Sequence, residues 1–112
     1  MRDLLASDEA NAAEAVELFC YHVAKQLGAL TAALGGLDAL VFTAGIGEHS
    51  DEVRERICRH SAWLGIELDG AANRAGGPRL TVEGSPVSAW VVPTDEERMI
   101  ALHTHDVLVP AL

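Results

Sequence analysis

The sequence is short of basic residues, and this shortage excludes several kinds of partner. It contains one lysine, Lys25, and eight basic residues in all against 17 acidic ones, so its formal net charge is −9. Because no cluster of lysine or arginine offsets this charge, neither nucleic acids nor membrane surfaces are expected as partners. An anionic ligand would have to be held by backbone amides, by arginine or through a metal ion.

Cysteine and long hydrophobic runs are also scarce. Cys20 and Cys58 fall within predicted helices and give no sign of a disulfide framework, so a reducing, cytoplasmic location is expected. No signal peptide is recognised, and no apolar span is long enough to cross a membrane. With 112 residues, 49% of them apolar and 22% charged, the sequence is expected to form a single domain, residues 1–112.

Apolar periodicity predicts a long first helix. Ser7 is a good N-cap, and Asp8 and Glu9 would complement the helix dipole in the first turn. Gly35-Gly36 would end the helix as a left-handed C-cap. Apolar residues recur at spacings of three and four, which predicts one broad buried face. This face comprises Val16, Phe19, Val23, Leu27, Leu30 and Leu34.

Two apolar runs, Leu37–Phe42 and Val87–Val92, predict buried strands that each lead directly into a helix. The first run is interrupted only by Asp38, as expected for a central strand that is covered on both faces. Ser50 would cap the following helix, which should extend to about Trp63. The charged side of that helix is predicted to face solvent and is given no function; it comprises Glu52, Arg54, Glu55, Arg56 and Arg59.

The segment between that helix and the second strand is expected to add little regular structure. Gly65–Asp69 alternates as an edge strand does, residues 71–79 should form a loop, and Leu80–Val82 should be extended. Strands alternating with helices predict an α/β fold. If the two strands are parallel, the polar turns Gly45–Glu48 and Asp95–Glu97 lie along one rim of the sheet, where ligands of such folds gather.

The turn Ala44–Glu48 is a candidate phosphate cradle. Gly45 and Gly47 lack a Cβ, so a ligand can approach the backbone, and free N–H groups are available where a helix begins. The residues alone leave a second interpretation open, in which the glycines serve only close packing of a strand and a helix. The turn lacks the third glycine of the dinucleotide fingerprint and the lysine of a P-loop.

A second polar turn follows the second strand. Thr94 and Glu97 fit a capping box, which would leave Glu96 free to face the rim. A carboxylate in that position suits Mg²⁺, which binds one or two carboxylates and keeps several waters. The alternative is that both glutamates only complement the dipole of the last helix.

The last helix should pack through Met99, His103 and Val107, with Pro110 beyond its end. His103 and His105 diverge on a helix because they are two residues apart, so no zinc site is expected. No arrangement of a nucleophile with a base is recognised, and no residue of the sequence is assigned a catalytic role.

Two motifs together resemble those of acetate kinases. Ala44-Gly45-Ile46-Gly47-Glu48-His49 resembles the family loop Gly-Gly-Ile-Gly-Glu-Asn. Pro93-Thr94-Asp95-Glu96-Glu97 resembles the family's C-terminal turn Pro-Thr-Asn-Glu-Glu. The intervening segment, including Leu64–Asp69 and Asn73, also matches in kind. The resemblance covers nearly the whole chain but only the C-terminal part of an acetate kinase.

This resemblance implies a partial C-terminal domain of the ribonuclease-H-like fold, as in the actin and Hsp70 ATPases. The family transfers the γ-phosphoryl group of ATP to acetate, giving acetyl phosphate and ADP, with Mg²⁺, and its members are homodimers. Carried over to this sequence, Ala44, Gly45, Ile46, Gly47 and Glu48 would hold the nucleotide. Arg2 would belong to an Asp-x-Arg nucleotide motif, and Glu96 would be the Mg²⁺-associated carboxylate.

The sequence also departs from the family pattern. Ala44 replaces a glycine, so a positive φ there would be strained, and His49 replaces an asparagine. The family's carboxylate pocket and its catalytic arginine, histidine and aspartate lie upstream, so the chain alone is expected to be inactive and cannot indicate acetate or propionate. The alternative is a non-catalytic module that kept the fold as a degenerate nucleotide-binding or interaction domain.

Overall fold

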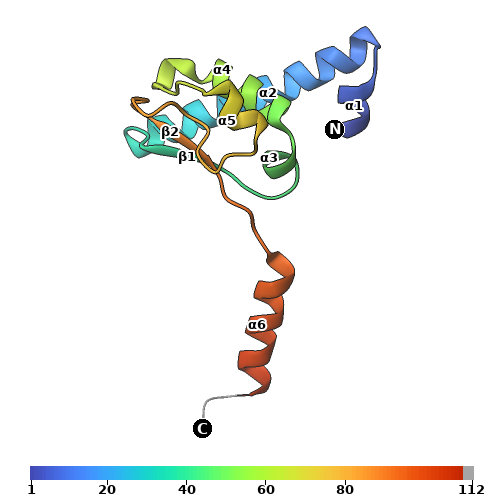
Figure 1. Cartoon of the computed structure of the whole chain (residues 1–112), viewed down its shortest axis with the longest axis vertical. Helices are drawn as coiled ribbons and strands as arrows, with labels where there is room; N and C mark the ends of the chain where they lie inside the picture. The colour runs from blue at the N-terminus through green and yellow to red at the C-terminus, as the bar shows by residue number, and fades with distance from the viewer. Residues whose placement is uncertain (110–112) are drawn as a thin grey trace.

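The computed structural model describes residues 1–109, and its centre is a small parallel sheet (Figure 1). Strands β1 (Ala39–Phe42) and β2 (Ser88–Val91) pair in parallel, from Ala39 opposite Ser88 to Phe42 opposite Val91. Both predicted strands and the α/β fold class are therefore confirmed. The prediction that the first strand is covered on both faces is wrong, because the Val41 side chain is 51% exposed. Within the described residues, β1 has a hydrogen-bonded neighbour on one side only.

Short bridges widen the sheet beyond β2. Ile66 pairs with Val87 in parallel, and antiparallel bridges join Leu68 to Thr81 and Arg79 to Trp90. The predicted edge strand Gly65–Asp69 and the extended stretch Leu80–Val82 are thus present as single bridges rather than full strands. They place Ile66, Leu80 and Thr81 among the buried residues.

The predicted loop over residues 71–79 is wrong in its first part, because helix α5 (Gly70–Arg74) lies there. Asp69 is its N-cap and accepts hydrogen bonds from the N–H groups of Ala71 and Ala72. An aspartate at this position satisfies donors that a short helix leaves free. The cap signal is plain in the sequence, but five residues are too few for a periodic pattern to reveal a helix.

The predicted N-cap of the long helix is also wrong. A short helix α1 (Arg2–Ala6) precedes it, and Ser7 is the C-cap of α1. Helix α2 (Ala10–Leu34) begins after Glu9, whose N–H donates to the Ser7 hydroxyl oxygen at 3.2 Å. At the other end the prediction is confirmed, because Gly35 ends α2 in the left-handed conformation with φ 81°.

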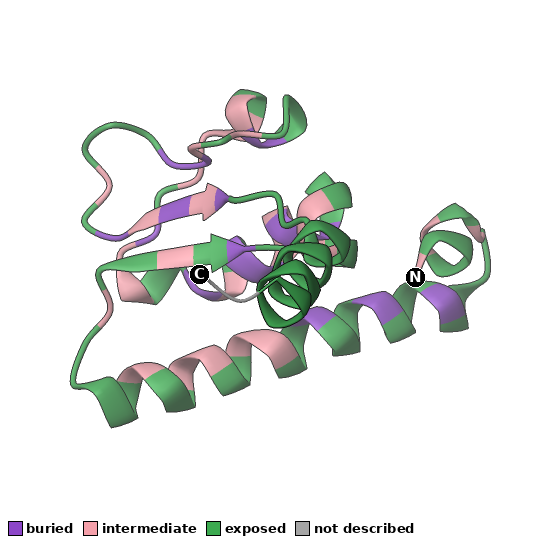
Figure 2. Cartoon of the chain, turned by 90° about the horizontal axis from the view of Figure 1, so that it is seen from below, coloured by how far each residue is buried: buried purple, intermediate pink, exposed green. Residues whose placement is uncertain are grey.

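The predicted buried face of α2 is confirmed in part, at Val16 and at the half-buried Val23 and Leu27 (Figure 2). Ala12, Val16 and Cys20 are buried, whereas Phe19 is 38% exposed and Leu34 is 76% exposed. The buried residues face helix α4 (Asp51–His60), which contributes Val53, Ile57 and Cys58 to the same core. The C-terminal half of α2 lies beside β1 but its side chains are only half-buried or exposed, and an apolar pocket of about 460 Å³ lies between them.

Helix α4 begins as predicted, with the Ser50 hydroxyl oxygen accepting a hydrogen bond from the N–H of Val53 at 3.2 Å. It ends at His60, earlier than predicted, and a 3₁₀ turn, η1 (Ala62–Leu64), follows. A one-turn helix, α3 (Gly45–His49), occupies the position of the predicted glycine turn. The chain therefore passes from β1 through α3 into α4 without a long loop.

The last helix, α6 (Glu96–Leu108), projects away from the rest of the molecule (Figure 1). Its side chains are all exposed, so the predicted packed side formed by Met99, His103 and Val107 is wrong. The extended segment 92–95 carries the helix beyond the reach of the sheet. Pro110 lies outside the described residues. Within residues 1–109, no helix combines the length and the apolar character that a membrane crossing requires.

The predicted capping box at the start of α6 is wrong as well. The N-cap is Asp95, one residue later than expected, and its carboxylate accepts a hydrogen bond from the N–H of Arg98 at 2.9 Å. Thr94 therefore precedes the cap, and Glu96 and Glu97 are the first two residues of the helix. Both are acidic residues in the first turn, where the helix dipole favours negative charge.

Candidate functional site

The two polar turns meet at one rim of the sheet, as the sequence predicted from parallel strands. An open pocket of about 320 Å³ is lined on one side by Ala44, Gly45, Glu48 and His49 and on the other by residues 94–97. Both turns follow directly after the carboxyl ends of β1 and β2. The parallel register of the strands therefore brings the glycine turn to the acidic turn.

The glycine turn has a strained backbone at its first residue. Ala44 has φ 53° and ψ 159°, a region that L-residues other than glycine seldom adopt, and Gly45 follows with φ 40°. The Ala44 carbonyl accepts the N–H of Glu48 at 3.1 Å, which closes the single turn of α3. A Cβ added at Gly45 would meet no atom within 4 Å, so the backbone there is open to a ligand.

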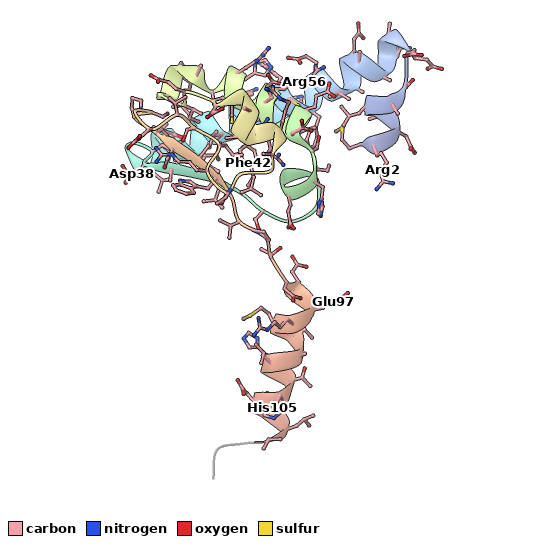
Figure 3. All side chains as sticks on the ribbon, viewed as in Figure 1. Arg2, Asp38, Phe42, Arg56, Glu97 and His105 are labelled. Atoms are coloured by element: carbon pink, nitrogen blue, oxygen red, sulfur yellow. The ribbon has the colours of Figure 1, made fainter. Side chains whose placement is uncertain are left out.

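The pocket between the turns is acidic. Its lining includes the carboxylates of Glu48, Asp95, Glu96 and Glu97, and Glu96 lies at the first position of α6, with Glu97 beside it (Figure 3). Carboxylate oxygens are the ligands that Mg²⁺ prefers, so the residues present fit such an ion. Among residues 1–109, however, no group of three or more acidic, histidine or cysteine side chains is arranged to hold a metal by itself.

Arg2 lies on the other side of the glycine turn. A second pocket, of about 520 Å³, is bordered by Arg2 and neighbouring residues of α1 on one side and by Gly45, Ile46 and residues 49–52 on the other. Helix α3 thus separates this pocket from the acidic one. The structure brings all the residues singled out from the sequence, from Arg2 through the glycine turn to Glu96, to the surroundings of α3.

Arg54 also belongs to this region, and the prediction that it faces solvent is wrong. Its side chain is only 2% exposed and points from α4 towards α3. Its Nη1 group donates to the carbonyls of Gly47 at 3.2 Å and Glu48 at 2.9 Å. Its Nε and Nη2 groups donate to the side-chain and backbone oxygens of Asn73, at 2.8 and 2.9 Å.

The sequence carries a signal for the burial of Arg54. On a helix it shares a face with residues three, four and seven positions later, namely Ile57, Cys58 and Ser61, all of which are buried. Burial lowers the pKa of Arg54, and the nearby carboxylate of Asp51 opposes this effect. Arginine remains charged even when buried, so a cation lies beneath the glycine turn.

Other titratable groups lie away from the rim. Glu17 on α2 pairs with His60 and with Arg56 on α4, and Figure 3 labels Arg56. The hydrogen bond from His60, followed by that from Arg56, lowers the pKa of Glu17. Burial raises the pKa of Cys58 to about 12, so this thiol stays protonated at neutral pH and is a poor nucleophile.

Solved structures of acetate kinases share the fold of this chain. The chain is similar to an acetate kinase from Porphyromonas gingivalis, with a TM-score of 0.81 and 36% identity over 96% of this chain and 28% of that one. It is also similar to the acetate kinase from Entamoeba histolytica, with a TM-score of 0.83 and 34% identity over 95% of this chain and 30% of that one.

A model of the acetokinase family matches residues 1–102, and the chain belongs to this family. It is 59% identical over 105 residues to an acetate kinase from Rhodopseudomonas palustris, and 56% identical over 104 residues to one from Rhizobium meliloti. These alignments cover 92% and 93% of the chain. In both cases they cover 26% of the relative, so the chain spans about a quarter of the length of these proteins.

Proposed function

We propose that the chain supplies the nucleotide-binding part of an acetate kinase, the ATP and Mg²⁺ half of its cleft. The reaction would be transfer of the γ-phosphoryl group of ATP to acetate, giving acetyl phosphate and ADP in the cytoplasm. The observation that supports this most is the shared pocket between the glycine turn Ala44–Glu48 and the acidic turn at Glu96. Nucleotide sites of open α/β folds lie at such strand ends.

In this proposal the five residues from Ala44 to Glu48 border the adenosine and the phosphates through their backbone. The open space at Gly45 supports a close approach of the ligand to the backbone. Arg2, which borders the opposite side of α3, would be the cationic side chain nearest to the nucleotide from α1. Glu96 would hold Mg²⁺ directly or through water, and the ion would neutralise charge between the β- and γ-phosphates.

The acidic lining of the pocket makes the metal essential to this proposal. Glu48 and the acidic turn would repel a free triphosphate, since like charges in contact disfavour each other. A nucleotide that arrives with Mg²⁺ carries less negative charge and offers the carboxylates a cation. Binding should therefore depend on the metal more strongly than at a site lined by lysine or arginine.

We also propose that these residues form part of a ribonuclease-H-like domain that further segments complete. The parallel strands followed by helices support this fold. The free edge of β1 and the exposed α6 are surfaces that other parts of a larger protein, or the second subunit of a homodimer, would cover.

Because the chain covers a quarter of its relatives and the acidic pocket has no arginine or lysine in its lining, we expect no phosphoryl transfer by the chain alone.

The competing proposal is a degenerate module without catalytic partners, and the strained Ala44 is the observation in its favour. Two-dimensional ¹⁵N–¹H spectra of the 112-residue chain, titrated with Mg·ADP and Mg·ATP, separate the two. Nucleotide binding predicts saturable shifts of the amides of residues 44–48 and of Arg2. The titration extends to a nucleotide concentration of about 10 mM, which would reveal even dissociation constants in the millimolar range. If neither nucleotide shifts these amides, nucleotide binding by this chain is rejected.

Matched variants make this titration specific. Gly45→Ala and Gly35→Ala place a Cβ at positive-φ positions where nothing lies within 4 Å, so their backbone costs are similar. Only Gly45→Ala should weaken binding, because Gly35 ends α2 at the opposite end of β1. Glu96→Gln should weaken binding of Mg·ATP but not of metal-free ATP, because the substitution removes a carboxylate that repels the free triphosphate. Glu97→Gln is the charge-matched control. Equal losses with and without Mg²⁺ would remove Glu96 from the metal site.

A further inference from the structure

Arg54 is a buried cation whose partners are all neutral oxygens of the glycine turn and of α5. It makes four hydrogen bonds, two to the carbonyls of Gly47 and Glu48 and two to Asn73. Asn73 is itself 1% exposed and donates through its side-chain amide to the Asp51 carbonyl at 2.8 Å. A buried charge is costly unless its hydrogen bonds are complete, so this arrangement fixes the guanidinium firmly in one orientation.

Helix α3 needs such support from outside. It has five residues, and an isolated single turn of helix is unstable because the cost of nucleation is not recovered. Two of the carbonyls in its last turn, those of Gly47 and Glu48, accept hydrogen bonds from Arg54. A cation at the carbonyl end of a helical turn also opposes the negative end of its dipole.

The orientation of the peptide groups follows from these contacts. In a trans peptide the carbonyl and the N–H point in opposite directions, so the Gly47 carbonyl that Arg54 holds fixes the direction of the Glu48 N–H, which donates to the Ala44 carbonyl at 3.1 Å. The Ala44 carbonyl shares its peptide group with the Gly45 N–H, which therefore points the opposite way, and Gly45 borders both the acidic pocket and the pocket beside Arg2. Arg54 therefore determines how the glycine turn presents its backbone to those two pockets.

We infer that Arg54, held in place by Asn73, is a positioning residue that sets the affinity of the turn Ala44–Glu48 for a nucleotide. It does not contact the ligand, because it lies buried behind α3. This inference rests on the proposed function of the turn and extends it to α5, which carries Asn73. The chain of contacts runs from α5 through the guanidinium to the backbone of the turn.

The test compares Arg54→Met, Arg54→Lys and Asn73→Ser with the unchanged chain at 10 °C. Met has nearly the length of the arginine side chain but no charge and no donor. Lys keeps the charge and a single donor group that can extend towards the carbonyls. We expect the dissociation constant of Mg·ADP to rise at least 10-fold in Arg54→Met. It should rise less in Arg54→Lys, which is the conservative rescue, and Asn73→Ser should lie between them.

A second readout separates positioning from general destabilisation. Amide hydrogen exchange of Gly47 and Glu48, measured without ligand, should accelerate in Arg54→Met more than exchange of core amides such as Val91. Leu80→Ala, which lowers stability at a buried position that does not touch the turn, should leave the dissociation constant within twofold. If Leu80→Ala weakens binding as much as Arg54→Met does, the inference is overturned.

The failure of this inference can be told from failure of the proposed function. If the unchanged chain binds nucleotide and Gly45→Ala weakens binding, but the Arg54 variants bind normally, Arg54 is not a positioning residue and the proposed function stands. If the unchanged chain shows no shift at the turn with either nucleotide, the proposed function falls and the inference falls with it.

Discussion

The N–H of Val92, one residue past the end of β2, donates at 2.9 Å to the carbonyl of Phe42, the last residue of β1. This bond holds the two chain segments together at the point where both leave the sheet. The glycine turn begins two residues after Phe42, and the acidic turn begins two residues after Val92. One backbone hydrogen bond thus links the strand ends to the pocket that the turns share.

Ala44 is expected to cost stability because of its backbone conformation. Replacing it by glycine should relieve about 1–3 kcal/mol of strain and lose about 0.5–1 kcal/mol to the greater freedom of glycine in the unfolded chain. Ala44→Gly should therefore raise the free energy of unfolding by about 1 kcal/mol, measured by urea denaturation. The control is Ala29→Gly, at an exposed position within α2, which should lower it by about 1 kcal/mol. Changes of the same sign in both variants would refute the strain at Ala44.

Local signals in the sequence were sufficient for the elements that rest on neighbouring residues. Ser50 caps α4 and Gly35 ends α2 because a hydroxyl near a free N–H and a glycine at positive φ act within a few residues. The two apolar runs predicted β1 and β2, whereas their parallel pairing was a condition of the sequence argument that the structure then met. The juxtaposition of the glycine turn with Glu96 was predictable under the same condition, since both turns follow the carboxyl ends of the strands.

The features that were missed depend on contacts between distant residues. Arg54 is buried because Asn73, 19 residues later, completes its hydrogen bonds, and no local pattern reveals that partner. The apolar residues of α6 predicted a packed face, yet packing requires a surface within reach of the segment 92–95. Phe19 was assigned to the core from its spacing alone, although the buried stripe of α2 follows Val16 and Cys20, which face α4.

Leu80 is expected to be a major contributor to stability, although it lies in a segment that pairs with the sheet only through isolated bridges. Its side chain is fully buried, so Leu80→Ala leaves a cavity and should lower the free energy of unfolding by about 2–5 kcal/mol. Leu34→Ala removes the same atoms at a position that is 76% exposed and should change it by less than about 0.5 kcal/mol. Urea denaturation followed by circular dichroism measures both. Similar losses in the two variants would contradict the placement of Leu80 in the core.

Asp95 should control the helicity of α6. An exposed helix of 13 residues has little support besides its own hydrogen bonds, so loss of the cap to Arg98 should cost about 1 kcal/mol locally. In Asp95→Ala, the Cα chemical shifts of residues 96–104 should move towards random-coil values. The urea midpoint for unfolding of residues 1–91 should stay unchanged. Thr94→Ala is the control, because Thr94 does not cap the helix. A loss of helicity in Thr94→Ala but not in Asp95→Ala would show that Thr94 is the N-cap, as the capping-box prediction had it.

The ion pair network of Glu17 predicts how stability depends on pH. The hydrogen bonds from His60 and Arg56 lower the pKa of Glu17 in the folded chain below its ordinary value of 4.5. A group with a lowered folded pKa stabilises the fold above its unfolded pKa, and this contribution disappears as the pH falls through the folded pKa. Glu17→Gln should therefore be less stable than the unchanged chain at pH 6, and the difference should shrink as the pH falls below 4.5.

Urea midpoints measured from pH 7 to pH 3 test this dependence. The control is Glu14→Gln, which removes an exposed carboxylate one turn earlier on α2 and should run parallel to the unchanged chain over the same range. Because Glu17 is about half exposed, added salt should reduce the difference at pH 6 by screening the pair. A gap between Glu17→Gln and the unchanged chain that persists undiminished at pH 3 would mean that the glutamine perturbs packing between α2 and α4 rather than removing an ionised partner.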